Sequence, residues 1–575
     1  EKVEEVENAF KLIAEEVVRR DLKDFKSGEL AMLANGLSKM EGEEVEKALK
    51  SIAEEVPWRD LKKFERQHLA MLANGLSKVG GNRVEEALKA IAEEVVRRDP
   101  KNFERQHLAM LANGLSKVGD EEIEKALKAI AKEVTSRGLK NFERQHLAML
   151  ANGLSKVEDE EIEEALKAIA NEVSRRDLEN FTLQHLALLA NGLSKVKGTR
   201  VEKALEAIAN EVSRRDLENS TLQHLTLLAN GLSKVKGTRV EKALKAIANE
   251  VSRRDLKKFE RKYLAMLANG LSKAEGEEIE NALKAIAEEI SRRDLENVTS
   301  QHLAMLVNGL SKVEGEEIGN ALKSIAKEVN WRGLKNFTSQ HLAMLANGLS
   351  KVEGEEIENT LKLIAEEITQ RDLKDFKSQY LAILLFAFTQ RGFYKLSAYD
   401  SLVRAMSHVL EDSQSVISTK SLTQLLQVHL ALHYLAPAQC QKISTQAVSR
   451  INKFEREFAA QVPSSSNLHR DVSEQLRRVY PNKTILNEQH LGVTFLDIEI
   501  PSMKIAIAVN GPSHYIKGTH TSKLDSQFLE ELTAKMLKKK GCKFLVLPYW
   551  EWNQLRTDEE KKVYLQKLTL GIVKK

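Results

Sequence analysis

A five-residue motif, Asn-Gly-Leu-Ser-Lys, recurs through most of the chain at one constant interval. Its asparagine occurs nine times, once every 39 residues, at Asn35, Asn74, Asn113, Asn152, Asn191, Asn230, Asn269, Asn308 and Asn347. A constant period of this length is typical of a solenoid, in which neighbouring repeats stack and bury one continuous core. We therefore expect residues 1–392 to form about nine to ten stacked repeats.

Each repeat contains two segments in which apolar residues follow a helical spacing. In the last full repeat the first segment, helix A, places on one face Leu342, Leu345, Ala346 and Leu349. After a break at Gly354 the second segment, helix B, does the same with Ile357, Leu361, Ile364, Ala365 and Ile368. Thr338 is placed to cap the start of helix A, and Arg371 to face the negative end of helix B. The pattern predicts a mostly α fold, an α-solenoid of helix-turn-helix repeats.

The composition agrees with an intracellular helical protein. Aromatic residues make up 5% of the chain and prolines number 8, which favours helices over a β-sandwich. The two cysteines, Cys440 and Cys542, are too few for a disulfide framework or a zinc site. No apolar run approaches the length of a membrane span. The opening segment, residues 1–20, matches the second half of later repeats, so we expect the array to start within a repeat, and an upstream targeting segment stays open.

The side of helix A opposite the apolar stripe carries the same residue types in most repeats. At about 100° per residue, these positions hold Gln, Met, Asn and Lys. We expect them to form a row on one surface, with an acidic row on helix B. The candidate ligand-binding residues are Gln67, Met71, Asn74, Lys78, Gln106, Met110, Asn113, Lys117, Gln145, Met149, Asn152, Lys156, Gln184, Asn191, Lys195, Gln223, Asn230, Lys234, Asn269, Lys273, Gln301, Asn308, Lys312, Gln340, Asn347 and Lys351.

The Asn-Gly pair is costly for a helix. A glycine inside a helix costs about 1 kcal/mol relative to alanine, so the repeated copies approach roughly 9 kcal/mol. Close approach of a neighbouring helix would explain the glycine. An outward-facing asparagine has no such packing reason, but its amide can hydrogen-bond the edge of a nucleotide base. We therefore predict a ligand groove, while the alternative that the lysines are simply solvated stays open.

The two residues before the glutamine fall into three classes. They are Glu-Arg in four repeats, as at Glu65-Arg66, Thr-Leu in two, as at Thr182-Leu183, and Thr-Ser in two, as at Thr299-Ser300. A constant scaffold with a few variable positions is typical of proteins that read one nucleotide per repeat. Neutral drift among duplicated repeats would produce the same classes, so both interpretations stay open.

The segment Phe-Thr-Ser-Gln-His-Leu-Ala-Met-Leu-Ala-Asn-Gly-Leu-Ser-Lys, residues 337–351, resembles the octotricopeptide repeat (OPR). The resemblance covers roughly residues 1–392 and implies binding of single-stranded RNA, chiefly in organelles, with bacterial members known. That family often has tryptophan where this chain has asparagine, so its base contacts are not transferred.

The pattern changes after the array. Phe386 stands where a tenth asparagine would fall, and residues 393–462 are predicted to be a helical capping or connecting region. Residues 463–466, Pro-Ser-Ser-Ser, are predicted to be a linker. Residues 467–575 are predicted to be a small α/β domain with a helix before its last strand. The predicted strands are 493–501, 503–512 and 543–552.

Two motifs in this last segment resemble the RAP domain: Asn-Gly-Pro-Ser-His-Tyr at 510–515 and Pro-Tyr-Trp-Glu-Trp at 548–552. The resemblance covers residues 467–575. It implies a restriction-endonuclease-like fold, in a module that often follows octotricopeptide repeats. Such folds cleave nucleic acid with divalent metal held by carboxylates on adjacent strands.

Asp497 is placed where such a fold has its first carboxylate, and Glu499 follows on the same strand face. RAP domains typically have two more carboxylates on the next strand, where this chain has Ala508 and Asn510. A methyl group and an amide lack the charge that Mg²⁺ requires. We therefore expect no catalysis, no cofactor and no bound metal, with Asp497, Glu499 and His514 as weak catalytic candidates.

Other residues of this domain are candidates for contacts with nucleic acid. Lys535, Lys538 and Lys539 are placed to meet phosphates, although a solvated helix face would look the same. Trp550 and Trp552 alternate on a predicted strand. We expect one of them in the core and the other free to stack on a base.

The combined pattern predicts a sequence-selective protein that binds single-stranded RNA, about one nucleotide per repeat, and controls RNA stability, processing or translation. Two alternatives stay open: an RNA endonuclease using the C-terminal domain, and an α-solenoid that binds proteins through the helix B face. We expect a monomer that does not contact membranes. We place it in a bacterial cytoplasm or an organelle matrix, and delivery into a host cell stays open.

Overall fold

The structure is a computed structural model that describes residues 2–412, 414–459, 465–492, 494–516 and 519–571. It divides into two compact units, an N-terminal unit of residues 1–282 and a C-terminal unit of residues 283–575. The linker predicted at 463–466 lies partly outside the described residues, as does the first residue of the strand predicted at 493–501.

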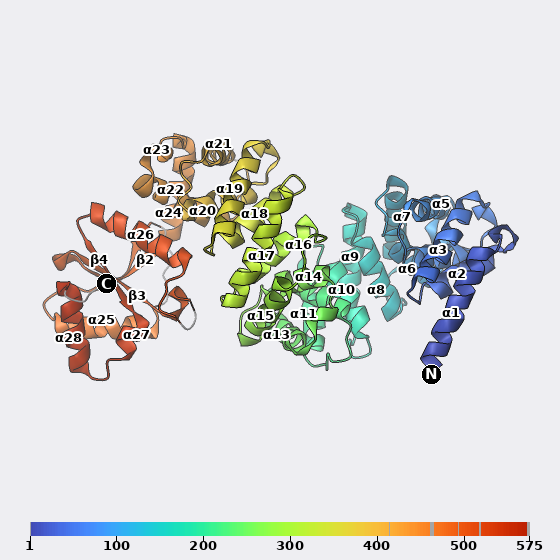
Figure 1. The fold of residues 1–575 in the computed structure, drawn as a ribbon, viewed down its shortest axis with the longest axis horizontal. Helices are drawn as coiled ribbons and strands as arrows, with labels where there is room; N and C mark the ends of the chain where they lie inside the picture. The colour runs from blue at the N-terminus through green and yellow to red at the C-terminus, as the bar shows by residue number, and fades with distance from the viewer. Residues whose placement is uncertain (1, 413, 460–464, 493, 517–518, 572–575) are drawn as a thin grey trace. The chain divides into compact units, whose positions relative to one another are not determined.

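The repeats form the predicted α-solenoid (Figure 1). The A helices are α2 (Ser27–Leu37), α4 (Arg66–Leu76), α6 (Arg105–Leu115), α8 (Arg144–Leu154), α10 (Leu183–Leu193), α12 (Leu222–Leu232), α14 (Arg261–Leu271), α16 (Ser300–Leu310), α18 (Ser339–Leu349) and α20 (Ser378–Gln390). The B helices are α1 (Lys2–Arg19), α3 (Glu43–Glu55), α5 (Asn82–Arg97), α7 (Glu121–Arg137), α9 (Glu160–Val173), α11 (Thr199–Val212), α13 (Thr238–Arg253), α15 (Glu277–Ser291), α17 (Glu316–Arg332) and α19 (Glu355–Thr369). Within each compact unit, A helices pack on A helices and B helices on B helices, which makes two layers.

The apolar stripes predicted from the spacing form the core between these layers. In helix α18 the buried residues include Leu342, Leu345, Ala346 and Leu349. In helix α19 they include Ile357, Leu361, Ile364, Ala365 and Ile368. Thr338 caps α18 as predicted, because its hydroxyl oxygen accepts a hydrogen bond from the backbone N–H of His341 at 3.3 Å. The sequence pattern therefore identified the buried face of each helix correctly.

The Asn-Gly pair lies in the last turn of helix A rather than in its middle. Helix α18 ends at Leu349, one residue after Gly348, and Ser350 follows as the C-cap. The Ser350 hydroxyl donates to the carbonyl oxygen of Asn347 at 3.2 Å, which satisfies an acceptor that the helix end leaves open. Because glycine is tolerated better near a helix end than inside, the predicted penalty of roughly 9 kcal/mol was too large.

Further helices follow the repeats in the C-terminal unit. They are α21 (Ser397–Glu411), α22 (Thr419–Leu435), α23 (Pro437–Cys440) and α24 (Thr445–Ala459). Phe386, at the place of a tenth asparagine, packs edge to face on Phe528 with 6.3 Å between ring centroids. Over the residues that the structure describes, no helix combines the length and the apolarity needed to cross a membrane.

The last segment folds as a small α/β domain. Helix α25 (Asn467–Val479) precedes a mixed sheet of β1 (Leu486–Leu491), β2 (Thr494–Ile500), β3 (Ile505–Asn510) and β4 (Lys543–Pro548), in that spatial order. The first three strands are antiparallel, and β4 runs parallel to β3 after helix α26 (Leu524–Lys539). Helices α27 (Tyr549–Asn553) and α28 (Asp558–Leu570) follow. This order agrees with the nuclease-like α/β fold that the resemblance implied, although strand β1 was not predicted.

The two faces of this sheet differ in character. Ile498, Ile507 and Leu547 face a core that Val472 of α25 and Leu565 of α28 complete. Because strand residues alternate between faces, Asp497, Glu499 and Asn510 lie on the opposite face. On that face Asn510 donates from Nδ2 to Oε1 of Glu530 in helix α26 at 2.7 Å. The polar candidates of the sequence therefore share one side of the sheet.

Candidate nucleic-acid interface

The A helices of the N-terminal unit line a hollow of about 770 Å³ that extends past several repeats. Its walls carry amides and ammonium groups from positions predicted to face outward, together with their first-repeat equivalents. These residues are Asn35, Lys39, Asn74, Lys78, Asn113, Gln145 and Gln184. Glu41 and Glu46 add acidic groups to the lining. The tertiary structure therefore brings together side chains that belong to successive repeats of the sequence.

The predicted rows differ in how far their side chains reach solvent. The glutamines are exposed at Gln67, Gln106, Gln145, Gln184, Gln223, Gln301 and Gln340. The lysines are exposed at Lys78, Lys117, Lys156, Lys195, Lys234, Lys273 and Lys312, and half-buried at Lys351. Met71 and Met110 are half-buried, and Met149 is buried. Glutamine and lysine are therefore the residue types of the row that solvent reaches.

The asparagines are partly or fully buried, in contrast to the exposed row that the spacing predicted. Asn74, Asn113, Asn269, Asn308 and Asn347 are half-buried, and Asn152, Asn191 and Asn230 are buried. Amide groups of successive repeats bond to each other: Asn113 donates to Asn74 at 3.2 Å, Asn152 to Asn113 at 3.1 Å and Asn230 to Asn191 at 3.3 Å. The expectation that asparagine has no packing reason was wrong, because it links one repeat to the next.

From the second repeat to the seventh, the glycine after the asparagine lets neighbouring A helices touch. A Cβ atom on Gly153 would lie 2.3 Å from the carbonyl oxygen of Ala112 in the preceding repeat. Cβ atoms added to Gly114 and Gly192 would lie 2.4 and 2.3 Å from the backbone of the preceding repeat. This confirms the explanation of the glycine by close helix approach. The Asn-Gly pair is therefore a device for packing repeats at short distance.

The lysines at the ends of the A helices form a row of like charges. Partial burial and the ammonium group of Lys78 lower the pKa of Lys117 below its ordinary value. Partial burial and the ammonium groups of Lys117 and Lys195 lower the pKa of Lys156 in the same way. Neither Lys117 nor Lys156 has an acidic partner in the part of the chain that the structure describes. A bound polyanion would relieve this repulsion.

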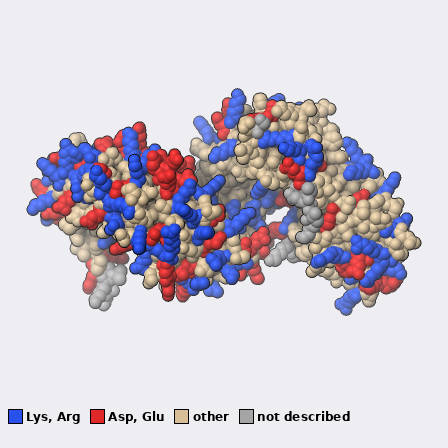
Figure 2. Space-filling model, turned by 180° about the vertical axis from the view of Figure 1, so that it is seen from behind, with Lys and Arg blue, Asp and Glu red and all other residues tan. Residues whose placement is uncertain are grey.

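The B helices were predicted to carry an acidic row, but many of their carboxylates are paired. Lys47 binds Glu43 at 2.6 Å and Lys167 binds Glu163 at 2.6 Å, each one helical turn apart. Lys128 reaches Asp159 of the next repeat at 2.8 Å. Figure 2 shows basic and acidic side chains interspersed over the repeats on the face that it displays. Charge alone therefore does not mark the B layer as an acidic surface.

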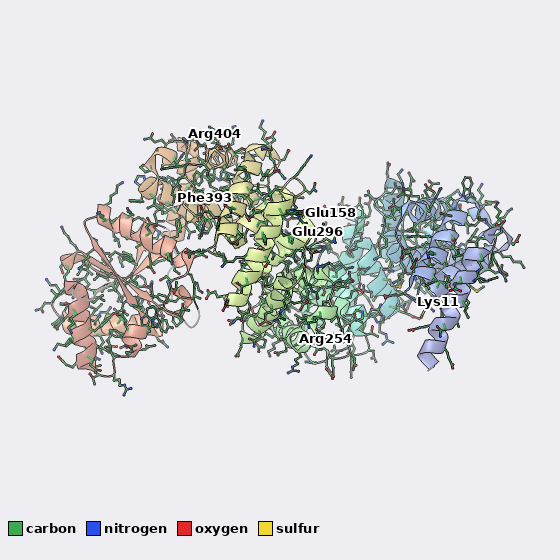
Figure 3. All side chains as sticks on the ribbon, viewed as in Figure 1. Lys11, Glu158, Arg254, Glu296, Phe393 and Arg404 are labelled. Atoms are coloured by element: carbon green, nitrogen blue, oxygen red, sulfur yellow. The ribbon has the colours of Figure 1, made fainter. Side chains whose placement is uncertain are left out.

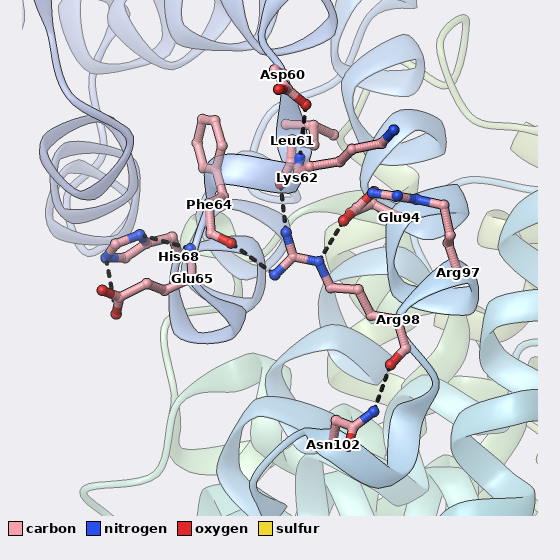
Figure 4. Close-up of polar contacts among 10 residues, drawn as sticks. All are labelled: Asp60, Leu61, Lys62, Phe64, Glu65, His68, Glu94, Arg97, Arg98 and Asn102. Carbon is pink, nitrogen blue, oxygen red and sulfur yellow. Dashed lines mark hydrogen bonds and ion pairs between the residues drawn. The ribbon is translucent and has the colours of Figure 1, made fainter.

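A second contact between repeats involves an arginine at the end of each B helix. Arg98 donates from its two terminal nitrogens to the carbonyl oxygens of Phe64 and Leu61, each at 2.7 Å, and its Nε contacts the carboxylate of Glu94 (Figure 4). The guanidinium therefore ties the end of helix α5 to the turn before helix α4, which joins this repeat to the preceding B helix, α3. We call this arrangement the arginine clamp.

The arginine clamp recurs along the array in both compact units. Its other arginines are Arg59, Arg137, Arg176, Arg215, Arg254, Arg332 and Arg371. Arg254, labelled in Figure 3, reaches the carbonyl oxygens of Ser220 and Leu217. The sequence prediction assigned Arg371 to the helix dipole alone. The missed signal was the recurrence, from repeat to repeat, of a glutamate one helical turn before an arginine.

The catalytic candidates of the C-terminal domain lie in different surroundings. Asp497 accepts a hydrogen bond from the backbone N–H of Val509 at 2.7 Å, and burial raises the pKa of its carboxyl group. Asn510 is buried against Glu530, so an amide contact occupies the place of one expected carboxylate. His514 is exposed, and Glu499 is half-buried beside Ala506 of the next strand. Ala508, as the sequence indicated, supplies no ligand.

The basic and aromatic candidates of this domain also lie in different surroundings. Lys535, Lys538 and Lys539 are all exposed, and the ammonium group of Lys539 also lies 4.9 Å from the ring centroid of Tyr434. Trp552 is in the core, and its indole N–H donates to Asp471 at 2.9 Å. Trp550 is half-buried, and His520 stacks on it at 4.2 Å between ring centroids. One tryptophan is core, as predicted, although both lie on helix α27 and not on a strand.

Comparison with known proteins identifies part of the C-terminal α/β domain. Residues 507–568 match the RAP domain family. No curated protein matches the chain. Two solved structures are similar over much of the chain. A homology model of the full-length AP-3 complex in an intermediate open conformation has a TM-score of 0.25 and 10% identity, covering 79% of this chain and 90% of that one.

The second solved structure, a crystal structure of importin beta, has a TM-score of 0.21 and 13% identity, covering 83% of this chain and 80% of that one. Both likenesses are too low to carry any functional argument. The RAP domain rests on the family match, and the helical repeats rest on the helices of the structure, so neither depends on these two likenesses. The chain is therefore a helical-repeat protein with a RAP domain near its C-terminal end.

Proposed function

We propose that the protein binds single-stranded RNA along the A helices of its repeats, about one nucleotide per repeat, and acts in post-transcriptional control. The observation that carries this proposal is the hollow lined by amides and ammonium groups that recur at the spacing of the repeats. The resemblance of the repeats to the octotricopeptide family and the RAP domain at residues 507–568 support the same class of ligand.

The lysines of the row would supply the affinity. Each would neutralise a phosphate and release a bound counterion, so binding would weaken as salt rises. Partial burial and, after it, the ammonium groups of Lys117 and Lys195 lower the pKa of Lys156, and an anionic strand would offset the repulsion among these lysines. The ammonium groups carry no information about base identity.

The exposed glutamines would supply selectivity. Gln145 and Gln184 lie in the wall of the hollow, and a side-chain amide can donate to and accept from a base edge. Asn74, Asn113 and Asn152 are already bonded to each other, so we assign these asparagines to the packing of repeats and not to base contacts.

A filter-binding titration tests the electrostatic part of the proposal. Replacing Lys117, Lys156 and Lys195 by alanine should weaken binding to every RNA and reduce the slope of log K against log salt by about 2, since each phosphate contact contributes roughly 0.7 on a single strand. The matched control removes three lysines that pair with glutamate on B helices, Lys47, Lys125 and Lys167. Equal effects of the two triple variants would remove the A-helix row as the binding surface.

In vitro selection from a random RNA pool tests selectivity. We expect a motif about as long as the number of repeats, about nine to ten nucleotides. Gln184→Ala should relax the preference at one position of that motif while leaving the salt slope unchanged. Selection without any enriched motif would reduce the proposal to non-selective binding.

A further inference from the structure

Three potential metal ligands that the sequence does not place together converge in the C-terminal domain. Nδ1 of His469 lies 2.9 Å from Oε1 of Glu488 and 3.7 Å from Oδ1 of Asp497. The ligand atoms of all three residues lie within 4.8 Å of one another. Only Asp497 was a candidate from the sequence, which predicted no metal because Ala508 and Asn510 stand where further carboxylates were expected.

The fold supplies these residues from three separate elements. His469 is near the start of helix α25, Glu488 lies on β1 and Asp497 lies on the adjacent strand β2. Glu488 has a φ of 51°, a left-handed backbone conformation that a glutamate adopts only at a cost in energy. Such strain inside a strand is typical of functional sites, where surrounding structure holds a side chain in a required position.

The imidazole ring of His469 is oriented like that of a metal-binding histidine. Nε2 of His469 lies 3.3 Å from Oδ1 of Asn487, an oxygen that also accepts a hydrogen bond from Ser473 at 2.8 Å. A proton on Nε2 donates to that oxygen and leaves the lone pair of Nδ1 facing the two carboxylates. Metal-binding histidines are held by an outer hydrogen bond of this kind.

The Nδ1 atom of His469 has no hydrogen-bond partner among the described residues. The His469 side chain is 3% exposed, and its Nδ1 makes no hydrogen bond of suitable geometry with any residue that the structure describes. The Ser465 hydroxyl donates to Oε1 of Glu488 at 2.8 Å, whereas Nδ1 of His469 faces both carboxylates without a hydrogen bond to any described residue. Such a buried arrangement is unfavourable unless a cation occupies the space.

We propose that His469, Glu488 and Asp497 bind a divalent transition-metal ion, Mn²⁺ or Zn²⁺. Ligands about 2.0–2.2 Å from one ion are about 3 Å apart when they are adjacent, so the distance of 2.9 Å between His469 and Glu488 already fits, whereas Asp497, at 3.7 Å from His469, must move closer to share the ion. One imidazole with two carboxylates favours these ions over Mg²⁺ and Ca²⁺, which prefer oxygen ligands alone. The Asp497 side chain is 32% exposed, which leaves coordination positions open to water or to a phosphate oxygen.

Calorimetric titration of the full chain with MnCl₂ and with ZnCl₂ tests the site. Asp497→Asn and His469→Gln should each weaken binding at least 10-fold. The matched control is Glu530→Gln, which alters a carboxylate of the same domain that bonds Asn510 outside the cluster. Wild-type protein that binds neither ion would overturn the proposal. Equal affinity in all variants would also overturn it.

A measurement on the unmodified chain covers the case in which a variant does not fold. X-ray absorption at the zinc edge should show imidazole nitrogen and carboxylate oxygen around the ion. A sulfur shell would assign the zinc to Cys440 or Cys542, and a shell of oxygen alone would exclude His469. Either spectrum would contradict the proposal, and the measurement requires no substitution.

Discussion

Asn152 donates a hydrogen bond from Nδ2 to Oδ1 of Asn113 at 3.1 Å, across the boundary between two repeats. Asn113 donates in turn to Asn74 at 3.2 Å. A side-chain amide offers a donor and an acceptor, so one asparagine serves both of its neighbours. Neither leucine nor aspartate at this position would do so. The contact joins stacked helices and explains a residue that otherwise suits a helix poorly.

Replacing Asn152 by alanine should destabilise the array by about 0.5–1.5 kcal/mol, because it leaves the amide oxygen of half-buried Asn113 without its donor. Urea unfolding followed by circular dichroism measures the change. Asn35→Ala is the control, since Asn35 makes no such bond within the described chain and should change stability little. A larger effect on RNA affinity than on stability would return asparagine to the set of base-contacting residues.

Gly153→Ala should lower the unfolding free energy by about 1–3 kcal/mol, because the added methyl group would overlap the backbone of Ala112. Gly36→Ala provides the comparison at the same position of the first repeat, where no atom lies within 4 Å of an added Cβ. That variant should be neutral or slightly stabilising, as alanine favours helix. Thermal unfolding of both variants decides the matter, and similar melting temperatures would contradict the close-packing explanation.

Arg98→Met should destabilise the protein by about 3 kcal/mol, since it removes both carbonyl contacts and leaves buried Glu94 with Arg97 alone. Arg20→Met removes the equivalent side chain of the first repeat, whose contact with Glu16 is exposed. An exposed pair of this kind contributes about 0–1 kcal/mol. If chemical denaturation gives the two variants equal losses, the arginine clamp does not stabilise the array.

The pH dependence of stability should report the same contact. Burial by itself raises the pKa of Glu94, but the hydrogen bonds from Arg97 and Arg98 outweigh it, so the pKa lies below the ordinary value. A carboxylate of this kind contributes stability above its unfolded pKa, about 4.3, and loses it as pH falls through the folded pKa. Wild type should therefore exceed Glu94→Gln in stability at pH 7 and approach it below about pH 4. A constant difference between pH 7 and pH 3 would contradict this assignment.

The sequence by itself determined the helical-repeat architecture. Leu345 and Leu349 of α18, and Ile357 and Ile364 of α19, are buried as the spacing predicted, because helical periodicity records which face avoids water. The Gln and Lys rows also followed from that periodicity. Their exposure needed no knowledge of the neighbouring repeat.

Only the tertiary structure decided what lies between repeats. Asn152 was predicted to face solvent, yet it is buried, because the next A helix approaches closely enough at Gly192 to cover it. Nor did the sequence place Glu488 beside His469, since β1 was not predicted and the two residues lie on different elements. Periodicity describes one helix at a time, whereas contacts between elements depend on how closely and in what register they pack.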